Sequence, residues 1–203
     1  VHGTAVQATR EMLVTRIMSQ ELPGGGWVLD TGFEVEDGDG SGSFTPSTDK
    51  ADPDITAMAI QALARYSSMN VTVNGTEKNV GDAIERGLNA LSAMQKSAGD
   101  FDSWGTTNVE STAQVLMALI AMGIDPLKDD RFITASGNTL INGILCYHVA
   151  GSGFRHVMDG SVNAMATDQA MYALVAYDRF LKGKNYIYNM SDNSEAHAIS
   201  IDT

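Results

Sequence analysis

The 203-residue chain is short of cysteine, of aromatic side chains and of positive charge. Its single cysteine, Cys146, cannot form a disulfide within the chain. Thirteen Lys and Arg stand against 25 Asp and Glu, which gives a net charge of −12. Because nucleic acids and anionic lipids are bound mainly through clustered Lys and Arg, we expect neither as a partner. No apolar run reaches the roughly 18 residues that a membrane span needs, so we expect no membrane insertion.

The composition that remains, 43% hydrophobic and 19% charged residues, is that of a protein with a packed core. We predict one domain over residues 1–183, with a Gly/Asp/Ser-rich acidic insertion at 30–53. Residues 184–203 lose helical periodicity and are predicted to form an extended C-terminal tail. Because Val1 is not a native initiator, we expect the chain to be part of a larger multidomain protein.

Apolar residues recur at helical spacing in three strongly hydrophobic segments, residues 54–66, 108–122 and 166–180. Aligning the Ala-Leu pairs of these segments brings three threonines nearly into register, at spacings of 56 and 55 residues: Thr56, Thr112 and Thr167. The three segments therefore indicate an internal repeat.

Three further segments, residues 4–19, 80–95 and 138–148, combine one apolar stripe with one polar face. Alternating half-exposed and fully apolar helices are typical of two helical layers. Strand patterns are scarce, apart from a possible short ribbon at Val71 and Val73 before the Asn74-Gly75 turn. We therefore predict an all-α fold, a curved stack of helical hairpins.

One segment carries a family motif. Residues 86–101 resemble the QW repeat of squalene cyclases and prenyltransferases, and they match it at Arg86, Gly87, Leu91, Gln95 and Gly99. Ala90 replaces the aromatic residue of that pattern and Phe101 replaces its Trp. A partial second copy is Gln20 with Gly25-Gly26-Trp27. A glutamine at a helix end can hydrogen-bond the following loop, so the motif favours a structural role.

The resemblance covers about residues 4–182 and implies an α/α toroid. A complete toroid needs more helices than the six or seven predicted here, which implies a partial ring. A Gly-Gly-Trp loop followed by Asp-x-Asp-x-Thr-Ala-Met-Ala is similar to cyclase-like domains of secreted or wall-attached Gram-positive proteins. The resemblance therefore implies an extracellular or cell-wall location.

The enzymatic alternative depends on Asp54. Class II terpene cyclases protonate an alkene with the middle acid of Asp-x-Asp-Asp-Thr-Ala, and Asp54 matches that acid. Ile55 replaces the third Asp, however, and Asp52 or Asp54 can instead cap the following helix. An aromatic content of 7% is also low for a pocket that stabilises carbocations.

Cofactor motifs are incomplete, so we expect no cofactor. The zinc site of protein prenyltransferases needs an Asp two residues before its Cys, which Cys146 lacks, and the thioester string of complement-type domains is absent. Asp37, Asp39 and Ser41 resemble the first half of a calcium loop, but Thr48 stands where the bidentate Glu belongs. Loosely bound calcium is the alternative there to a solvated acidic loop.

In the resembling fold, loops that lead into the inner helices converge at one end of the ring. This implies a concave face lined by Trp27, Phe44, Trp104 and Phe154, with Asp54, Glu110, His156 and Tyr172 nearby. A hollow with aromatics and a few polar groups is the default ligand site, although the aromatics can equally pack against the hairpin loops.

We therefore expect a non-catalytic adhesion or ligand-binding module that recognises a surface protein, a glycan or a small hydrophobic ligand. The alternatives are a divergent cyclase- or prenyltransferase-like enzyme with Asp54 as acid, and a carrier of a corrinoid-type cofactor.

Overall fold

The computed structural model describes residues 7–29, 33–35, 42–44 and 50–192 and contains six α-helices within them. These are α1 (Arg10–Ser19), α2 (Pro53–Leu63), α3 (Val80–Met94), α4 (Val109–Ala121), α5 (Leu140–Leu145) and α6 (Ala164–Leu181). Short 3-10 helices follow α2 at Ala64–Tyr66 and precede α5 at Asp130–Phe132. Every α-helix overlaps a segment whose periodicity predicts one, so the positions of the helices are confirmed.

The helices are connected by small β-hairpins, each with two antiparallel strands. The pairs are β1 (Phe33–Val35) with β2 (Gly42–Phe44), β3 (Asn70–Val73) with β4 (Thr76–Asn79), β5 (Phe101–Ser103) with β6 (Thr106–Asn108), and β7 (His148–Val149) with β8 (Gly153–Phe154). The expected all-α, toroid-like fold is therefore wrong, because the described chain mixes helices with β-hairpins. Strands of two to four residues are too short to show alternation, and only the ribbon at Val71 and Val73 is confirmed.

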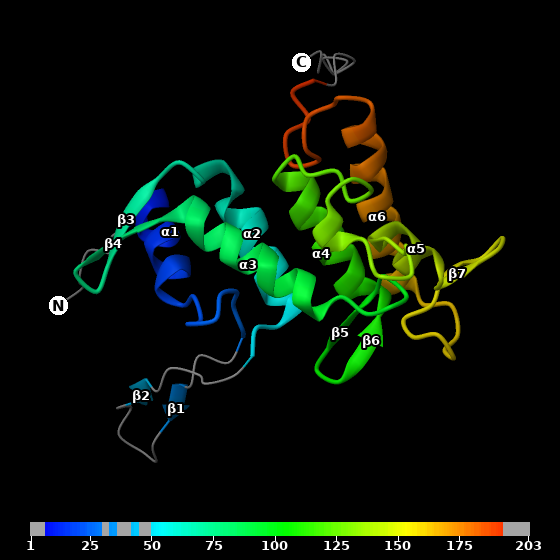
Figure 1. Cartoon of the computed structure of the whole chain (residues 1–203), viewed down its shortest axis with the longest axis horizontal. Helices are drawn as coiled ribbons and strands as arrows, with labels where there is room; N and C mark the ends of the chain where they lie inside the picture. The colour runs from blue at the N-terminus through cyan, green and yellow to red at the C-terminus, as the bar shows by residue number, and fades with distance from the viewer. Residues whose placement is uncertain (1–6, 30–32, 36–41, 45–49, 193–203) are drawn as a thin grey trace, which may run out of the picture.

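The core lies between two rows of helices, an inner row of α2, α4 and α6 and an outer row of α3 and α5. α4 packs between α2 and α6, while α3 lies against α2 and α5 lies against α4. Figure 1 shows α1 and the β3–β4 hairpin at one end of this arrangement and α6 at the other. The central position of α4 explains its composition, because residues 115–120 are all buried.

The same contacts recur at the start of α2, α4 and α6. In each case the N-cap side chain accepts a hydrogen bond from the backbone three residues later, the caps being Asp52, Asn108 and Asn163. The repeated threonine, four residues after each cap, accepts a hydrogen bond from the backbone N–H of an aromatic residue in the preceding segment. The pairs are Thr56 with Trp27, Thr112 with Phe101 and Thr167 with Phe154. The threonine register in the sequence therefore reflects one repeated connection between loop and helix.

Glycines of the outer helices mark where loops pack against them. A Cβ on Gly143 of α5 would lie 2.5 Å from the carbonyl oxygen of Gly99, so backbone touches backbone there. Gln95, the C-cap of α3, donates to that same carbonyl at 3.3 Å and to the carbonyl of Phe132 at 3.2 Å. The expected bond from this glutamine to the following loop is confirmed, whereas Gln20 donates to the hydroxyl of Ser19.

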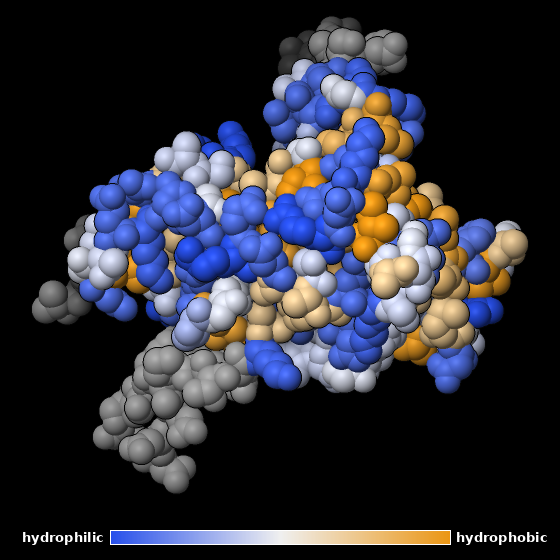
Figure 2. Space-filling model, viewed as in Figure 1, coloured by the Kyte–Doolittle hydropathy of each residue, from blue (hydrophilic) through white to orange (hydrophobic). Residues whose placement is uncertain are grey.

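The chain after α6 turns back onto the helices. Tyr186 donates its hydroxyl to Oε1 of Gln61 in α2 at 2.9 Å, and Arg179 pairs with Asp192 at 2.8 Å. On the face in Figure 2, hydrophobic surface gathers over the half of the molecule that carries α4 and α6. Within the described ranges no helix combines the length and the hydrophobicity needed to cross a membrane.

Candidate functional site

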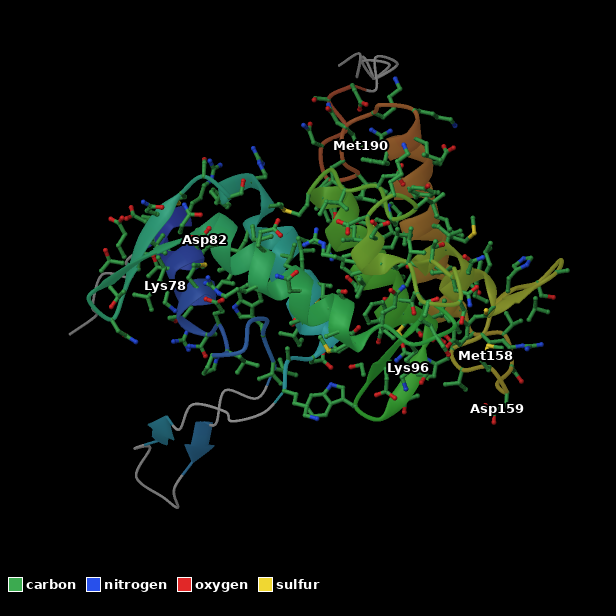
Figure 3. All side chains as sticks on the ribbon, viewed as in Figure 1. Lys78, Asp82, Lys96, Met158, Asp159 and Met190 are labelled. Atoms are coloured by element: carbon green, nitrogen blue, oxygen red, sulfur yellow. The ribbon has the colours of Figure 1, made fainter. Side chains whose placement is uncertain are left out.

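A hollow of about 560 Å³ lies where the N-terminal halves of α2, α4 and α6 meet the β5–β6 hairpin. We call it the acidic pocket and define it by the residues that line it: Asp54, Met58, Ser103, Trp104, Thr106, Asn108, Glu110, Gln114, His156, Met165 and Gln169. Figure 3 labels Lys96, which pairs with Asp102 of β5, and Met158, which follows His156 by two residues.

Two carboxylates of the acidic pocket have an oxygen without a hydrogen-bond partner. Glu110 accepts from Nδ1 of His156 through Oε2 at 2.8 Å, but its Oε1 is buried and unpaired. Oδ1 of Asp54 is likewise buried and unpaired. Asp52, not Asp54, caps α2 and also accepts a 2.6 Å bond from Ser103. Since Asp52 satisfies the end of the helix, the carboxylate of Asp54 is left to face the pocket.

The electrostatics of the pocket are unbalanced. Its lining includes Asp54 and Glu110 but no Lys or Arg among the residues that the structure describes. Burial raises the pKa of Asp54 above its ordinary value of 3.8, the charges of Asp52 and Glu110 raise this pKa further, and the neighbouring hydroxyls of Ser111 and Ser103 oppose them. The folded protein therefore holds a proton on Asp54 more tightly than the unfolded chain does.

This shift predicts a pH effect on stability. Because the folded state retains the Asp54 proton, the contribution of Asp54 to the free energy of unfolding is largest below pH 3.8 and falls as the pH rises toward its raised folded pKa. In the Asp54→Asn variant this loss is absent, so the variant should gain stability relative to wild type between pH 3.5 and neutral pH. Urea denaturation of both proteins at each pH measures the difference, in which the titration of groups distant from Asp54 cancels. A difference that does not change with pH would contradict the shift.

Trp104 stands at the mouth of the pocket in a strained turn. Trp104 and Gly105 form the two-residue turn of the β5–β6 hairpin, with φ angles of 54° and 80°. Asn74 and Gly75 form the β3–β4 turn with nearly the same angles, 50° and 77°. Asn-Gly suits this geometry, whereas a bulky aromatic residue does not. Because Trp104 is 73% exposed, packing does not offset the strain, and such positions cluster at binding sites.

We expect Trp104→Asn to raise the free energy of unfolding by about 1 kcal/mol, because asparagine tolerates the left-handed conformation better than tryptophan. The reverse substitution, Asn74→Trp, places the same strain in the other hairpin and should lower stability by a similar amount. Chemical denaturation of both variants gives the two values. Unchanged stability in both would show that neither turn stores strain.

The structure brings together four of the residues that the sequence singles out, namely Asp54, Trp104, Glu110 and His156, in the acidic pocket. Trp27 is 2% exposed, and its indole N–H donates to the carbonyl of Ile17. Phe154 is also buried, with its ring beside His148. These two aromatics pack against their own loops and helices.

The remaining sequence candidates lie elsewhere. Tyr172 lies at the middle of α6, and its ring is 6.0 Å from that of Tyr188. The backbone of Phe44 belongs to β2, but its side chain is outside the described part of the structure, as are Asp37, Asp39 and Ser41 of the possible calcium loop. Cys146 is exposed and follows α5.

Sequence reasoning missed a row of amides across the inner helices. Gln61 donates to Oε1 of Gln114 at 3.1 Å, and Gln114 donates to Oε1 of Gln169 at 3.4 Å. Gln114 and Gln169 line the pocket, one from α4 and the other from α6. A signal was present, because these glutamines recur within apolar helices at spacings of 53 and 55 residues, close to the period of the repeat.

A search of the described residues finds no group of three or more His, Cys, Asp and Glu side chains arranged to hold a metal ion. The described lining of the pocket offers carboxylates, amides, the imidazole of His156 and one exposed indole. Comparison of the chain with protein-family models, with curated protein sequences and with solved structures gives no match.

Proposed function

We propose that the chain is a non-catalytic ligand-binding module and that the acidic pocket is its binding site. The observation that carries the proposal is the coexistence of two buried, unpaired carboxylate oxygens with an exposed tryptophan in one hollow. Unpaired buried acceptors are costly in a folded protein unless something binds them. A strained, exposed Trp104 is costly in the same way, and binding would account for both.

The partner we favour is a group presented by a protein, a glycan or a small ligand outside the cell, with the chain as one module of a larger extracellular or wall-associated protein. The net charge of −12 supports a partner other than nucleic acid. The hollow is open to solvent, and among the described residues that line it Trp104 is the only Phe, Tyr or Trp. Such a site is better suited to recognition than to enclosing a reactive carbocation.

The experiment is a binding screen that uses four classes of probe: neutral oligosaccharides, organic cations, organic anions and terpenoids. We expect at least one class to change the tryptophan emission and to raise the melting temperature of the wild-type protein. Trp104→Ala should weaken that binding by about tenfold or more, since aromatic anchors dominate binding energies. Tyr188→Ala is the matched control, because Tyr188 is 72% exposed but does not line the pocket. Failure of all four classes to bind would remove the proposal.

A second candidate is proton donation by Asp54, in a divergent cyclase- or prenyltransferase-like enzyme. The raised pKa of Asp54 favours it, because a carboxyl that keeps its proton can act as a general acid. Turnover of an isoprenoid by the wild-type protein, abolished in Asp54→Asn, would establish this function in place of simple binding. The corrinoid-carrier alternative stays a prediction, and retention of cobalamin absorbance after dialysis tests it.

A further inference from the structure

We propose that the acidic pocket binds a positively charged nitrogen group, a primary ammonium or a guanidinium, between the carboxylates of Asp54 and Glu110 and beside the ring of Trp104. The inference rests on the proposed binding function and adds the chemical class of the ligand. Three features of the pocket support it: the charge of the pocket, its unpaired hydrogen-bond acceptors and the indole at its mouth.

The acidic side chains of the pocket favour a cationic ligand. The side chain of Glu110 is nine-tenths buried, its Oε1 has no partner, and it lines the hollow. Asp54 adds a second unpaired carboxylate oxygen. His156, which bonds the other oxygen of Glu110, is the only basic side chain among the described lining residues. A buried carboxylate is stabilised when it is paired, so the charge of this pocket favours a cationic ligand.

The unpaired hydrogen-bonding groups of the pocket favour a ligand that donates hydrogen bonds. Three donors of the lining are engaged within the protein: Ser103 donates to Asp52, the amide of Asn108 donates to the carbonyl of Thr106, and the amide of Gln114 donates to Gln169. The unpaired groups, by contrast, are carboxylate oxygens, which only accept when ionised. A ligand that satisfies them must donate hydrogen bonds. Ammonium and guanidinium groups donate several and accept none, whereas a carboxylate or phosphate would add further acceptors.

The indole of Trp104 also favours a cationic ligand. Tryptophan is the aromatic side chain whose face attracts cations most strongly, and the attraction grows where water is excluded. Trp104 lines the hollow together with Asp54 and Glu110 while 73% of its own surface is exposed. A cation seated on the carboxylates would cover part of that surface. Contact between this ligand and the indole would then account for the strained turn at Trp104.

The ammonium group can belong to a free amine or to a lysine side chain of a polypeptide. Two pairs of probes separate these sources while testing the same chemistry. The first pair is cadaverine and the diol of the same chain length. The second pair is an end-blocked Gly-Lys-Gly peptide and its norleucine counterpart. Binding is measured by titration calorimetry at neutral pH and physiological ionic strength, which suppresses diffuse attraction to the net negative charge.

We expect the charged member of at least one pair to bind about tenfold or more tightly than its neutral counterpart. Asp54→Asn and Glu110→Gln should each weaken that binding by about tenfold or more, and both keep the size of the side chain they replace. Tighter binding of the lysine peptide than of cadaverine would identify a polypeptide as the source, and the reverse order would identify a free amine.

The matched control is Asp82→Asn. Asp82 also lies in the first turn of a helix, α3, but it is exposed and outside the pocket. Figure 3 shows it at the opposite end of α3 from Lys96 and the β5–β6 hairpin. We expect this variant to bind the charged probe within about twofold of wild type, because a screened surface charge contributes little.

The outcomes separate the two proposals. Equal binding of charged and neutral probes, or an equal loss in Asp82→Asn and Asp54→Asn, would overturn the cation inference. Binding of neutral sugars in a Trp104-dependent manner, without binding of either cation, would overturn the inference while leaving the proposed binding function intact. If the four-class screen also finds no ligand, both proposals fall together.

Discussion

Replacing Gly143 with alanine is expected to lower the free energy of unfolding by about 3 kcal/mol, the upper part of the range for overpacking. The new Cβ would lie 2.5 Å from the carbonyl oxygen of Gly99, 2.6 Å from its carbonyl carbon and 2.8 Å from the backbone nitrogen of Asp100. All three atoms belong to backbone, so no rotamer change relieves the contact. The loop after α3 and helix α5 must then separate, although alanine on its own favours a helix.

Urea denaturation measures this loss, and Gly24→Ala serves as the control. Gly24 has no heavy atom within 4 Å of the position of an added Cβ, and its φ is not in the positive range. The control should therefore stay within about 0.5 kcal/mol of wild type. If Gly143→Ala were as stable as the control, the close approach of α5 to the Gly99 loop would be refuted. Loss of stability in both variants to the same extent would also contradict the explanation, because it would not depend on the contact.

The repeat in the sequence includes a glycine at which an outer helix meets a loop. Gly87 and Gly143 align at a spacing of 56 residues, and in the structure each meets the loop of the preceding unit. A Cβ on Gly87 would lie 3.0 Å from the ring of Trp27, as one on Gly143 would meet the backbone of Gly99. The periodicity of apolar residues is sufficient to predict the helices, since burial of one face requires it. The hairpins between them are not predictable in the same way, because two to four residues show no period.

The candidate site was only partly predictable, for reasons of geometry. Asp54 and Glu110 each lie in the first turn of an inner helix, so that alignment of the repeats places them together. Tyr172 was grouped with them, but it lies eight residues into α6, about 12 Å from the start of that helix. It therefore lies beyond the end at which the pocket forms.

The sequence alone could not show which aromatic candidates of the site are buried and which is exposed. Trp27 and Phe154 are buried, while Trp104 is exposed, although all three occupy glycine-rich loops that precede inner helices. The difference depends on the hairpin register. Ser103 pairs with Thr106, which places Trp104 at the tip of the turn rather than on a strand facing the helices. No local feature of the sequence distinguishes a tip from an inward-facing position when each strand has three residues.

Thr56→Val is the second substitution with a large expected effect, a loss of about 2–3 kcal/mol from the free energy of unfolding. The hydroxyl of Thr56 accepts from the backbone N–H of Trp27 at 2.9 Å and donates to the Trp27 carbonyl at 3.0 Å. Valine has nearly the same shape, so packing is kept while the buried N–H loses its acceptor. The Trp27 carbonyl retains a second donor, the N–H of Asp52, so the penalty comes mainly from the N–H.

The repeat supplies its own control in Thr167→Val. Thr167 accepts a hydrogen bond from the backbone N–H of Phe154 at 2.9 Å, which is the same bond at the start of α6. Thr56 is completely buried, whereas Thr167 is partly exposed, so water can replace its hydroxyl. Chemical denaturation should therefore give a loss of about 1 kcal/mol for Thr167→Val. Equal losses in the two variants would show that water access does not set the cost, and the connection between loop and helix would have to be explained by packing alone.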